Sequence, residues 1–373
     1  MATARGPPVG RKIDQGGRGA SLILHIPRIF PSYFCILLLT NYDRSLYITH
    51  MLNETKSAIS ITCKACDVRC QSIGVHRNGL RRFRCPKCRK SYTEPHRRVL
   101  DSMYISSEKA TLALQLLLEG NSLRSTQRIT GLDVNTIMTL LLKAGERCQK
   151  LMYDKMRNLR LPYLQCDEIW CFVGKKEKRV RKDDAPELGN QWIFVAIDEQ
   201  SKLVPYFEIG KRTRETTEQF LNGLRWTLSE DHLQITTDGY HFYRSIQSIF
   251  AGRVDFAQLV KLFGDFGQER GPEARYSPSG LTEVISKVVD GRPDPEHIST
   301  SFVERQNLTM RMQMRRLTRL TNAFSKSLKH LTAAVNLHFA YYNFCRTHRT
   351  IRVTPAMESG IADHVWTIAE LIA

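Results

Sequence analysis

The chain has 373 residues, a length that predicts two or three domains with a well-buried core and excludes a small scaffold stapled by disulfides. Hydrophobic residues make up 42% and charged residues 25%, which excludes a chain that is wholly disordered, collagen-like or a coiled-coil rod. The 55 Lys and Arg against 37 Asp and Glu give a formal net charge of +18, which favours a polyanionic partner such as nucleic acid over a membrane.

The basic residues are clustered along the chain. Residues 63–98 hold eleven Lys and Arg against two acids, residues 175–182 hold six against one, and residues 305–353 hold ten and no acid. A solvated basic surface can give the same net charge, but these three stretches carry 27 of the 55 basic residues. The pattern therefore favours a nucleic-acid footprint.

The Gly-, Arg- and Pro-rich residues 1–50 differ in character from everything that follows Met51. We expect them to be a poorly ordered extension, and an over-long start assignment is one explanation. The apolar stretch 21–40 is interrupted by Pro27, Arg28 and Pro31, so it is too short to span a bilayer. Four of the ten cysteines form two C-x-x-C pairs, which favours a reducing compartment, and we expect a cytoplasmic, nucleoid-associated protein.

Residues 51–100 are predicted to form a zinc ribbon. The two cysteine pairs are eighteen residues apart, and four thiolates at this spacing can hold one structural Zn²⁺ tetrahedrally. His76 could replace one thiolate and Cys70 is a spare, but the symmetric pairing favours the four-cysteine set. The expected ligands are Cys63, Cys66, Cys85 and Cys88.

Residues 101–158 are predicted to be helical. A helix ending near Gly120, a short helix ending at Gly131 and a longer helix capped by Asp133 follow the order of a helix-turn-helix. A generic three-helix bundle has the same pattern, and the preceding basic ribbon favours the DNA-reading version. In that version Asn135, Thr136 and Thr139 would face the DNA groove.

The hydrophobic period then changes to that of an α/β domain over residues 159–350. The expected elements are strands at 164–173, 192–198 and 202–209, a helix at 216–228, a strand at 233–237, a helix at 241–250 and a strand at 253–260. Three strands, helix, strand, helix, strand is the order of an RNase H-like mixed sheet with flanking helices. Residues 264–298 are predicted to be a surface insertion, because 264–295 contain nine Gly and Pro. Helices are expected at 301–319 and 328–344, and residues 351–373 as a C-terminal tail.

Three acidic residues lie where this topology can bring them together. Asp167 is in the first strand, Asp238 ends the fourth strand beside it, and Glu304 begins the helix after the insertion. Carboxylates so arranged suit two divalent cations for phosphodiester chemistry. Asp198 is the chief rival, and Glu168 is expected to point to the opposite face by the period-two rule. Glu304 could also be a helix N-terminal charge.

Several motifs resemble those of bacterial insertion-sequence DDE transposases of the founding type. They are Cys-Asp-Glu-Ile-Trp at 166–170, Thr-Thr-Asp-Gly at 236–239 and, most specifically, Ser-Thr-Ser-Phe-Val-Glu-Arg-Gln-Asn-Leu-Thr-Met-Arg at 299–311. The resemblance covers about 61–366 and implies a DDE integrase core behind a zinc ribbon and a helix-turn-helix. It also implies Asp167, Asp238 and Glu304 as the catalytic triad holding Mg²⁺ or Mn²⁺, one ion activating the nucleophile and the other the leaving oxygen.

The sequence thus predicts a DNA transposase that binds terminal inverted repeats and target DNA, as a homo-oligomer on double-stranded DNA. The alternative is a non-catalytic DNA-binding regulator derived from a transposase. Besides the helix-turn-helix residues, the expected DNA contacts are Arg81, Arg82, Arg84, Arg305, Asn307, Arg311 and Arg315.

Overall fold

The computed structural model describes residues 60–76, 80–94, 103–264 and 280–373. The predictions for residues 1–50 lie outside these ranges. None of the helices in the described ranges combines the length and apolar composition that a bilayer span requires.

The cysteine-rich segment forms a three-stranded antiparallel sheet of β1 (Gln71–Val75), β2 (Arg81–Arg84) and β3 (Ser91–Thr93). β2 alternates as expected for one buried face, because Phe83 is buried between exposed Arg82 and Arg84. Its small core, made of Phe83 and cysteines, is separate from the main hydrophobic core of the chain.

Three helices follow: α2 (Ser107–Leu118), α3 (Leu123–Thr130) and α4 (Val134–Lys155). The side chain of Asp133 accepts a hydrogen bond from the backbone N of Asn135, so it caps α4 as predicted. Gly131 ends α3 in the left-handed conformation, which favours glycine.

These helices share one hydrophobic core with the rest of the chain. α4 packs along α8 (Leu328–Phe344), and a Cβ on Gly145 would meet the Cα of Ala333 at 2.5 Å. The predicted separation of residues 101–158 into a domain of their own therefore does not describe the packing. The apolar stripe of α4, which suggested a small bundle, is covered by a helix about 190 residues further on.

The central sheet has six strands in the order β6-β5-β4-β7-β8-β9. Its strands are β4 (Tyr163–Val173), β5 (Gly189–Asp198), β6 (Phe207–Gly210), β7 (Leu233–Thr237), β8 (Val254–Gly264) and β9 (Gly280–Asp290). β4, β7 and β8 are parallel to one another, whereas β5, β6 and β9 run antiparallel to their neighbours. The mixed α/β sheet agrees with the prediction, as does the chain order of three strands, helix, strand, helix and strand.

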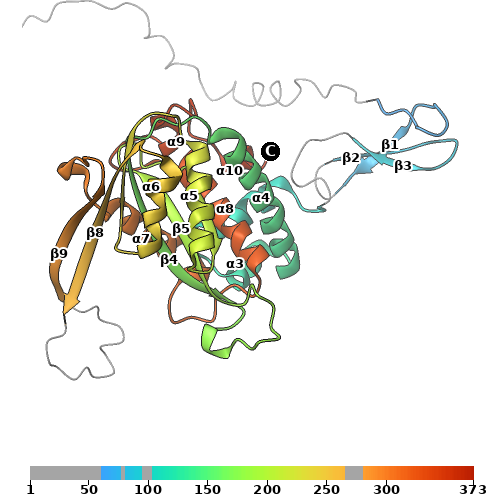
Figure 1. Cartoon of the computed structure of the whole chain (residues 1–373). Helices are drawn as coiled ribbons and strands as arrows, with labels where there is room; N and C mark the ends of the chain where they lie inside the picture. The colour runs from blue at the N-terminus through green and yellow to red at the C-terminus, as the bar shows by residue number, and fades with distance from the viewer. Residues whose placement is uncertain (1–59, 77–79, 95–102, 265–279) are drawn as a thin grey trace, which may run out of the picture. The chain divides into compact units, whose positions relative to one another are not determined.

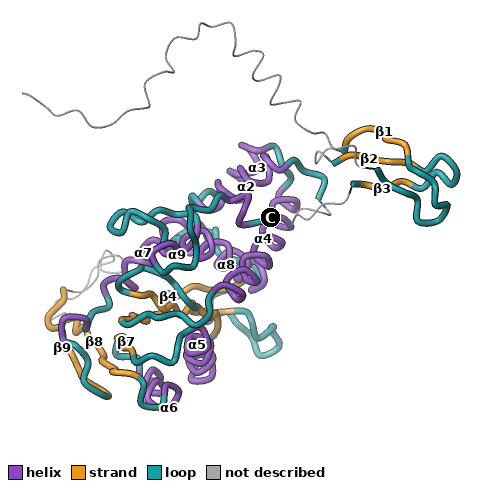
Figure 2. Tube along the Cα trace, turned by 90° about the horizontal axis from the view of Figure 1, so that it is seen from above, coloured by secondary structure: helices purple, strands orange, loops and turns teal. Residues whose placement is uncertain are grey.

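Helices cover both faces of the sheet. Figure 2 shows α5 (Arg214–Thr227) and α6 (Ile246–Phe250) on one side, and α7 (Ser301–Gln313) and α8 on the other. Figure 1 shows the β8–β9 hairpin at the margin of the sheet, away from α5. The core strand β5 is buried continuously from Ile193 to Asp198, as expected for a strand covered on both faces.

Three predicted elements differ from the structure. Only residues 207–210 of the expected third strand form β6, because the Asn343 side chain satisfies both the N–H and the C=O of Val204 in place of a neighbouring strand. The predicted surface insertion contains the eleven-residue β9, whose residues 281–290 include no Gly or Pro. The helix expected to reach residue 319 ends at Gln313, and a short 3₁₀ turn (Arg315–Leu317) follows.

Residues 351–373, expected as a C-terminal tail, pack against the preceding part of the chain. α9 (Pro355–Glu358) and α10 (Ile368–Leu371) bury Ala356 and Leu371. The backbone N of Trp366 donates to the carbonyl of Phe344 at 3.0 Å, which ties this segment to the end of α8.

Candidate active site

Two aspartates follow directly on paired residues of adjacent parallel strands. Cys166 of β4 is in register with Thr237 of β7, so Asp167 and Asp238 are the next residues along the two strands. Asp167, Asp238 and Glu168 each have one carboxylate oxygen within 4.8 Å of the corresponding oxygens of the other two. Neighbouring parallel strands bring such residues to the same level of a sheet, at the edge where ligands commonly bind.

The carboxylate of Asp167 is partly buried and is held by two hydrogen bonds. Its Oδ1 accepts a hydrogen bond from the N of Glu168, and its Oδ2 accepts one from Nδ2 of Asn307, both at 2.8 Å. Burial, together with the negative charge of Asp238, raises the pKa of Asp167 to about 6. On the other strand, Asp238 Oδ1 accepts a hydrogen bond from the N of Tyr240 at 2.9 Å.

Glu168 was expected to lie apart from this group, and the structure corrects that prediction. Its side chain is 2% exposed and its Oε1 accepts from Nε of Arg212 at 2.9 Å. β7 pairs with β4 only as far as Cys166, so beyond that point the longer glutamate side chain can reach round the end of β7. Burial, followed by the charge of Asp238, raises the pKa of Glu168 to about 8.

Glu304 lies on the first turn of α7, which a residue of β4 fixes in place. Gln165 Oε1 accepts hydrogen bonds from the backbone N of Phe302 at 2.9 Å and of Val303 at 3.3 Å. The first backbone N–H groups of a helix have no partner within it, and the N-cap residue Thr300 makes no capping hydrogen bond to them. α7 is thereby anchored beside the strand that carries Asp167.

The carboxylate of Glu304 does not belong to the group of three. Its Oε1 accepts from Thr300 Oγ1 at 2.7 Å and forms an ion pair with Lys261 of β8. Its charge nevertheless contributes to the raised pKa of Asp167, so the two carboxylates are close enough to interact. Lys261 thus neutralises the acid that sequence reasoning assigned to the metal.

Asp198, the rival candidate, has a structural setting. Its Oδ2 accepts from both the N and the Oγ of Ser201 at 2.7 Å, and its side chain is buried at the turn that follows β5. It is not part of the acidic group that the described residues form. The hydrogen bonds identify Asp198 as a turn residue.

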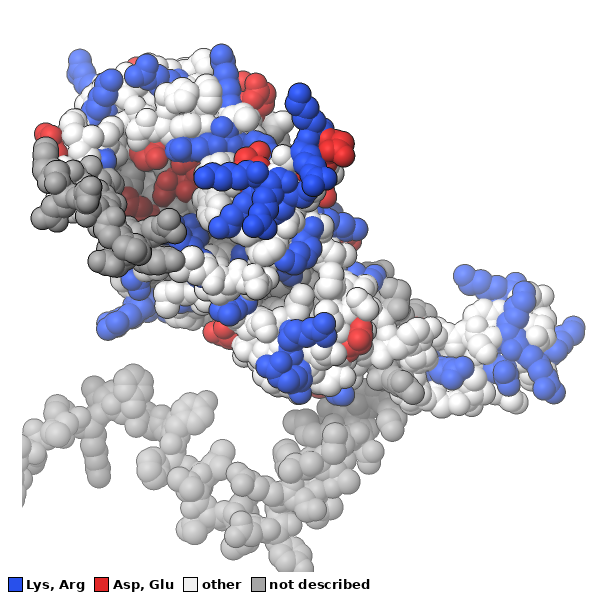
Figure 3. All heavy atoms as spheres, turned by 90° about the horizontal axis from the view of Figure 1, so that it is seen from below, with Lys and Arg blue, Asp and Glu red and all other residues white. Residues whose placement is uncertain are grey.

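Two of the basic stretches found in the sequence line one cleft. This cleft of about 600 Å³ is lined by six Lys and Arg and by no acid. Its lining includes Trp170 of β4, three residues beyond Asp167 in the sequence. The basic lining residues are Lys175, Lys176, Arg179, Arg311, Arg316 and Arg319. Figure 3 shows acidic side chains gathered in a recess of one face, with Lys and Arg beside them.

The residues expected to contact DNA lie in different settings. Asn307 is 9% exposed and donates to Asp167, and Arg311 donates to the carbonyls of Leu317 and Trp170. Both side chains are thus engaged within the protein. The face of α7 that carries Asn307 and Arg311 was expected to meet DNA, but α7 packs against β4.

The remaining expected DNA contacts lie at or near the surface. Arg82, Arg84, Asn135, Thr139, Arg305 and Arg315 are exposed, whereas Arg81 and Thr136 are half-buried. Arg315 lies on the 3₁₀ turn after α7, so it does not share the helix face of Glu304. Asn135 and Thr139 lie on the first two turns of α4, near its N-terminus.

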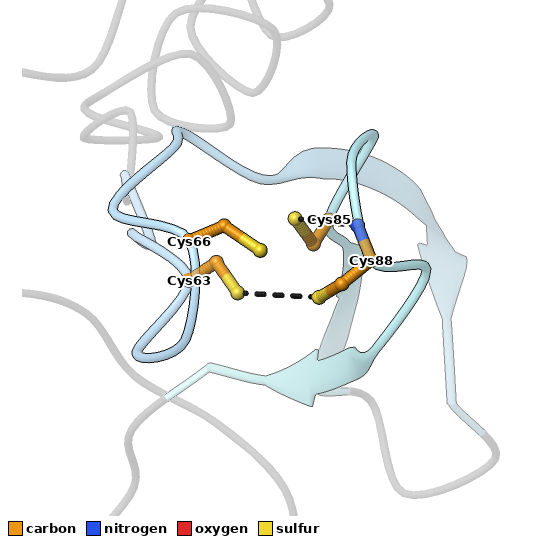
Figure 4. A group of neighbouring side chains, drawn as sticks. All are labelled: Cys63, Cys66, Cys85 and Cys88. Atoms are coloured by element: carbon orange, nitrogen blue, oxygen red, sulfur yellow. Dashed lines mark hydrogen bonds between the residues drawn. The ribbon is translucent and has the colours of Figure 1, made fainter.

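Four cysteine side chains point toward one another from two loops of the ribbon (Figure 4). The four Sγ atoms all lie within 4.8 Å of one another, and those of Cys63 and Cys88 are 3.5 Å apart. Four Zn–S bonds of about 2.3 Å in a tetrahedron require sulfurs about 3.8 Å apart, so the set fits Zn²⁺. The backbone N of Cys88 donates to Cys85 Sγ at 3.4 Å, as is common for a thiolate ligand. Cys70 and His76 are not members of this group.

Sequence reasoning missed three residues of the acidic site. Arg212 lies between Glu168 and Asp238, Lys261 pairs with Glu304, and Gln165 holds the start of α7. Gln165 precedes Asp167 by two positions and therefore shares its face of the strand, a signal that the period of a strand supplies. Nothing in the sequence pattern distinguishes Arg212 or Lys261 from other basic residues.

No protein-family model matches the chain, and no curated protein sequence matches it. Among solved structures, a piggyBac transposase synaptic complex with hairpin DNA is similar at 11% identity and a TM-score of 0.31, covering 72% of this chain and 70% of that chain. A Mos1 transposase paired-end complex is similar at 15% identity and a TM-score of 0.18, with 45% of this chain and 60% of that chain covered. A pre-cleavage Mos1 transpososome gives 13% identity and a TM-score of 0.18. TM-scores this low do not establish a common fold.

Proposed function

We propose that this chain is a DNA transposase of the insertion-sequence DDE type. In this proposal it binds the terminal inverted repeats of a mobile element and catalyses metal-dependent cleavage and transfer of DNA strands. Asp167 and Asp238 hold divalent cations, Glu304 completes the triad, and the four clustered cysteines hold a structural Zn²⁺.

The observation that carries the proposal is the convergence of Asp167 and Asp238. The two carboxylates lie within 4.8 Å of each other at adjacent parallel strands, and the burial of Asp167 together with the charge of Asp238 raises the pKa of Asp167 to about 6. Placing like charges together at a partly buried edge is costly unless a cation neutralises them. Mg²⁺ and Mn²⁺ prefer such oxygen ligands, and when bound they stabilise the charge that develops in phosphoryl transfer.

The surrounding residues orient this site. Asn307 donates to one oxygen of Asp167, which leaves the orientation of that carboxylate fixed while its remaining lone pairs stay free. Gln165 fixes the start of α7 and so the distance of Glu304 from β4. Lys261 on Glu304 and Arg212 on Glu168 are the cations that balance the acidic group in this structure.

The basic cleft beside the acidic site gives the DNA a path. Its exposed Lys176, Arg179 and Arg319 can neutralise backbone phosphates without reading sequence. The other three basic side chains are engaged within the protein, Lys175 with Asp184, Arg311 with two carbonyls and Arg316 with Ser325. Trp170, Cys171 and Phe172 of β4, the strand that carries Asp167, form part of the cleft lining. The exposed residues of α4 and of the ribbon would supply the contacts that select the element ends.

Nicking of a labelled duplex by the full chain tests the proposal. We expect Mg²⁺ or Mn²⁺ to permit cleavage at the end of the element and Ca²⁺ alone to permit binding with little cleavage. A chain that binds the duplex and never cleaves it with any of these ions would instead be a DNA-binding regulator. Absence of both binding and cleavage would contradict either function.

A further inference from the structure

The outer strand of the central sheet, β9, has an open edge. It ends the strand order of the sheet, and among the residues that the structure describes no strand pairs with its outer side. β9 has eleven residues, about twice the usual strand length, and contains no proline. An edge of this kind presents unpaired N–H and C=O groups to any matching strand.

Four of the exposed side chains of β9 are large and apolar, although edge strands usually carry polar ones. Leu281, Val284, Ile285 and Val288 are between 41% and 56% exposed. The first nine residues of the strand are exposed, which leaves both faces of its outer half uncovered. Figure 1 shows the hairpin extending from the body of the sheet, where no helix covers it.

β9 is also complementary to itself. Irregularities in its pairing with β8 leave Glu283–Val288 as a regular stretch. Two copies related by a two-fold axis normal to the sheet keep the same face up, so each residue lies opposite one an even number of positions away. In the register centred on Ile285, Glu283 of each copy lies opposite Lys287 of the other.

The charges select this register over its neighbours. A register centred on Val284 places Glu283 opposite Ile285, and one centred on Ser286 places Glu283 opposite Val289. Neither Glu283 nor Lys287 has an ion-pair partner within the described part of the chain. Opposite charges directly across an antiparallel pair stabilise it, and the two-fold symmetry makes each such pair occur twice.

We infer that β9 is the interface for a second copy of this chain, which pairs edge to edge and antiparallel with Ile285 at its centre. The result is a continuous twelve-stranded sheet with Ile285 in contact with its own counterpart. This interface requires no DNA and does not depend on the proposed function. The acidic site at β4 and β7 does not take part in this interface, because β8 and β9 lie between it and the second copy.

The first test is the mass of the full chain, freed of nucleic acid, measured by light scattering and sedimentation at physiological ionic strength. We expect a reversible dimer in the wild type. Glu283→Lys places like charges opposite each other twice and should weaken the dimer about tenfold or more. The double variant Glu283→Lys with Lys287→Glu restores opposite charges and should restore the dimer. Glu358→Lys, the same charge change at an exposed site on α9, should leave it unchanged.

Disulfide trapping gives a second readout that does not depend on affinity. Ile285→Cys should form a disulfide between copies on mild oxidation, because directly opposite Cα atoms are about 5 Å apart. Val288 lies three positions from the centre of this register, so the two thiols of Val288→Cys are far apart and should not join. Mass spectrometry of the linked peptide separates this disulfide from the native cysteines.

A monomeric wild type over the accessible concentration range would overturn the inference. So would a dimer that Glu283→Lys leaves unchanged, a weakened dimer that the double variant does not rescue, or a disulfide through Val288→Cys and none through Ile285→Cys. A monomer that still nicks DNA with Mg²⁺ would overturn the interface alone. A dimer without any cleavage would keep the interface and overturn the proposed function.

Discussion

Asp167 and Glu168 are acids that hold their protons unusually well in the folded chain. Their pKa values are raised to about 6 and about 8 by burial and by the charge of Asp238. An acid with a raised folded-state pKa binds protons more tightly in the folded than in the unfolded chain. Its contribution to stability is therefore lost as the pH rises from about 4, its unfolded pKa, through the folded value.

We therefore expect the free energy of unfolding to fall between about pH 6.5 and about pH 8 when no divalent cation is added, because Glu168 still titrates there. Below this range the buried His338, whose pKa is lowered to about 3, contributes stability that rises with pH. Added Mg²⁺ should reduce this fall, because a cation offsets the repulsion among the carboxylates. Urea unfolding at several pH values measures the effect, with Asp167→Asn as the variant whose pH profile should be flatter. A stability that rises over this pH range without Mg²⁺ would show that the acids are not buried together.

For single residues, the sequence predicted positions in the sheet better than the contacts that the side chains make. Asp167 and Asp238 were predicted as neighbours because strand order fixes which residues follow each other across a parallel pair. Glu168 was not, because alternation gives only the direction of a Cβ, and a glutamate beyond the end of β7 can turn back. Asn307 was assigned to DNA because the helical period does not show which face packs on β4.

The crossing of α4 and α8 depends on one glycine. A Cβ at Gly145 would come within 2.6 Å of three atoms of Ala333, two of them on the backbone, so the helices would have to move apart. We expect Gly145→Val to destabilise the fold by about 1–3 kcal/mol, despite a small gain in helix propensity. Chemical denaturation measures this loss. Glu146→Val places the same side chain on the exposed face of α4 and should change stability by less than about 1 kcal/mol. Equal effects from the two variants would argue against a tight crossing.

The ribbon is expected to depend on its metal, because its own core is small and separate from the main one. Cys85→Ser removes one of the four clustered thiols and should lower the zinc content to near zero and weaken binding to element ends. The thermal unfolding of the rest of the chain should change little. Cys70→Ser, at a buried cysteine outside the cluster, should keep its zinc. Full zinc content in Cys85→Ser would show that the ligand set is different.

Elements were predicted well where a single periodicity ran without interruption. α8, β7 and the capped start of α4 lie where their patterns predicted them. β9 was missed because Gly and Pro at either end of it gave a whole stretch the composition of a loop. The early end of α7 was missed because no proline or glycine marks it.

The whole molecule brings the basic stretches 175–182 and 305–353 to one cleft, although some 130 residues separate them. Binding to duplex DNA should therefore weaken steeply with salt, with a log-log slope of about −0.9 per phosphate neutralised. Replacing the exposed Lys176 and Arg179 by Ala should make the slope shallower by about one or two phosphates and weaken binding to all sequences alike. An affinity that does not change with salt would contradict a nucleic-acid partner.

The central claim is that the acidic site cleaves DNA with the help of a divalent cation, and Mg²⁺-dependent nicking across charge-removing variants tests it most directly. Asp167→Asn, Asp238→Asn and Glu304→Gln keep the size of each side chain and remove one charge. We expect each to lower nicking by about a hundredfold or more while DNA binding is unchanged or slightly tighter. Glu358→Gln, an exposed acid on α9, should keep full activity. Wild-type nicking that persists in Asp167→Asn or Asp238→Asn would contradict the account.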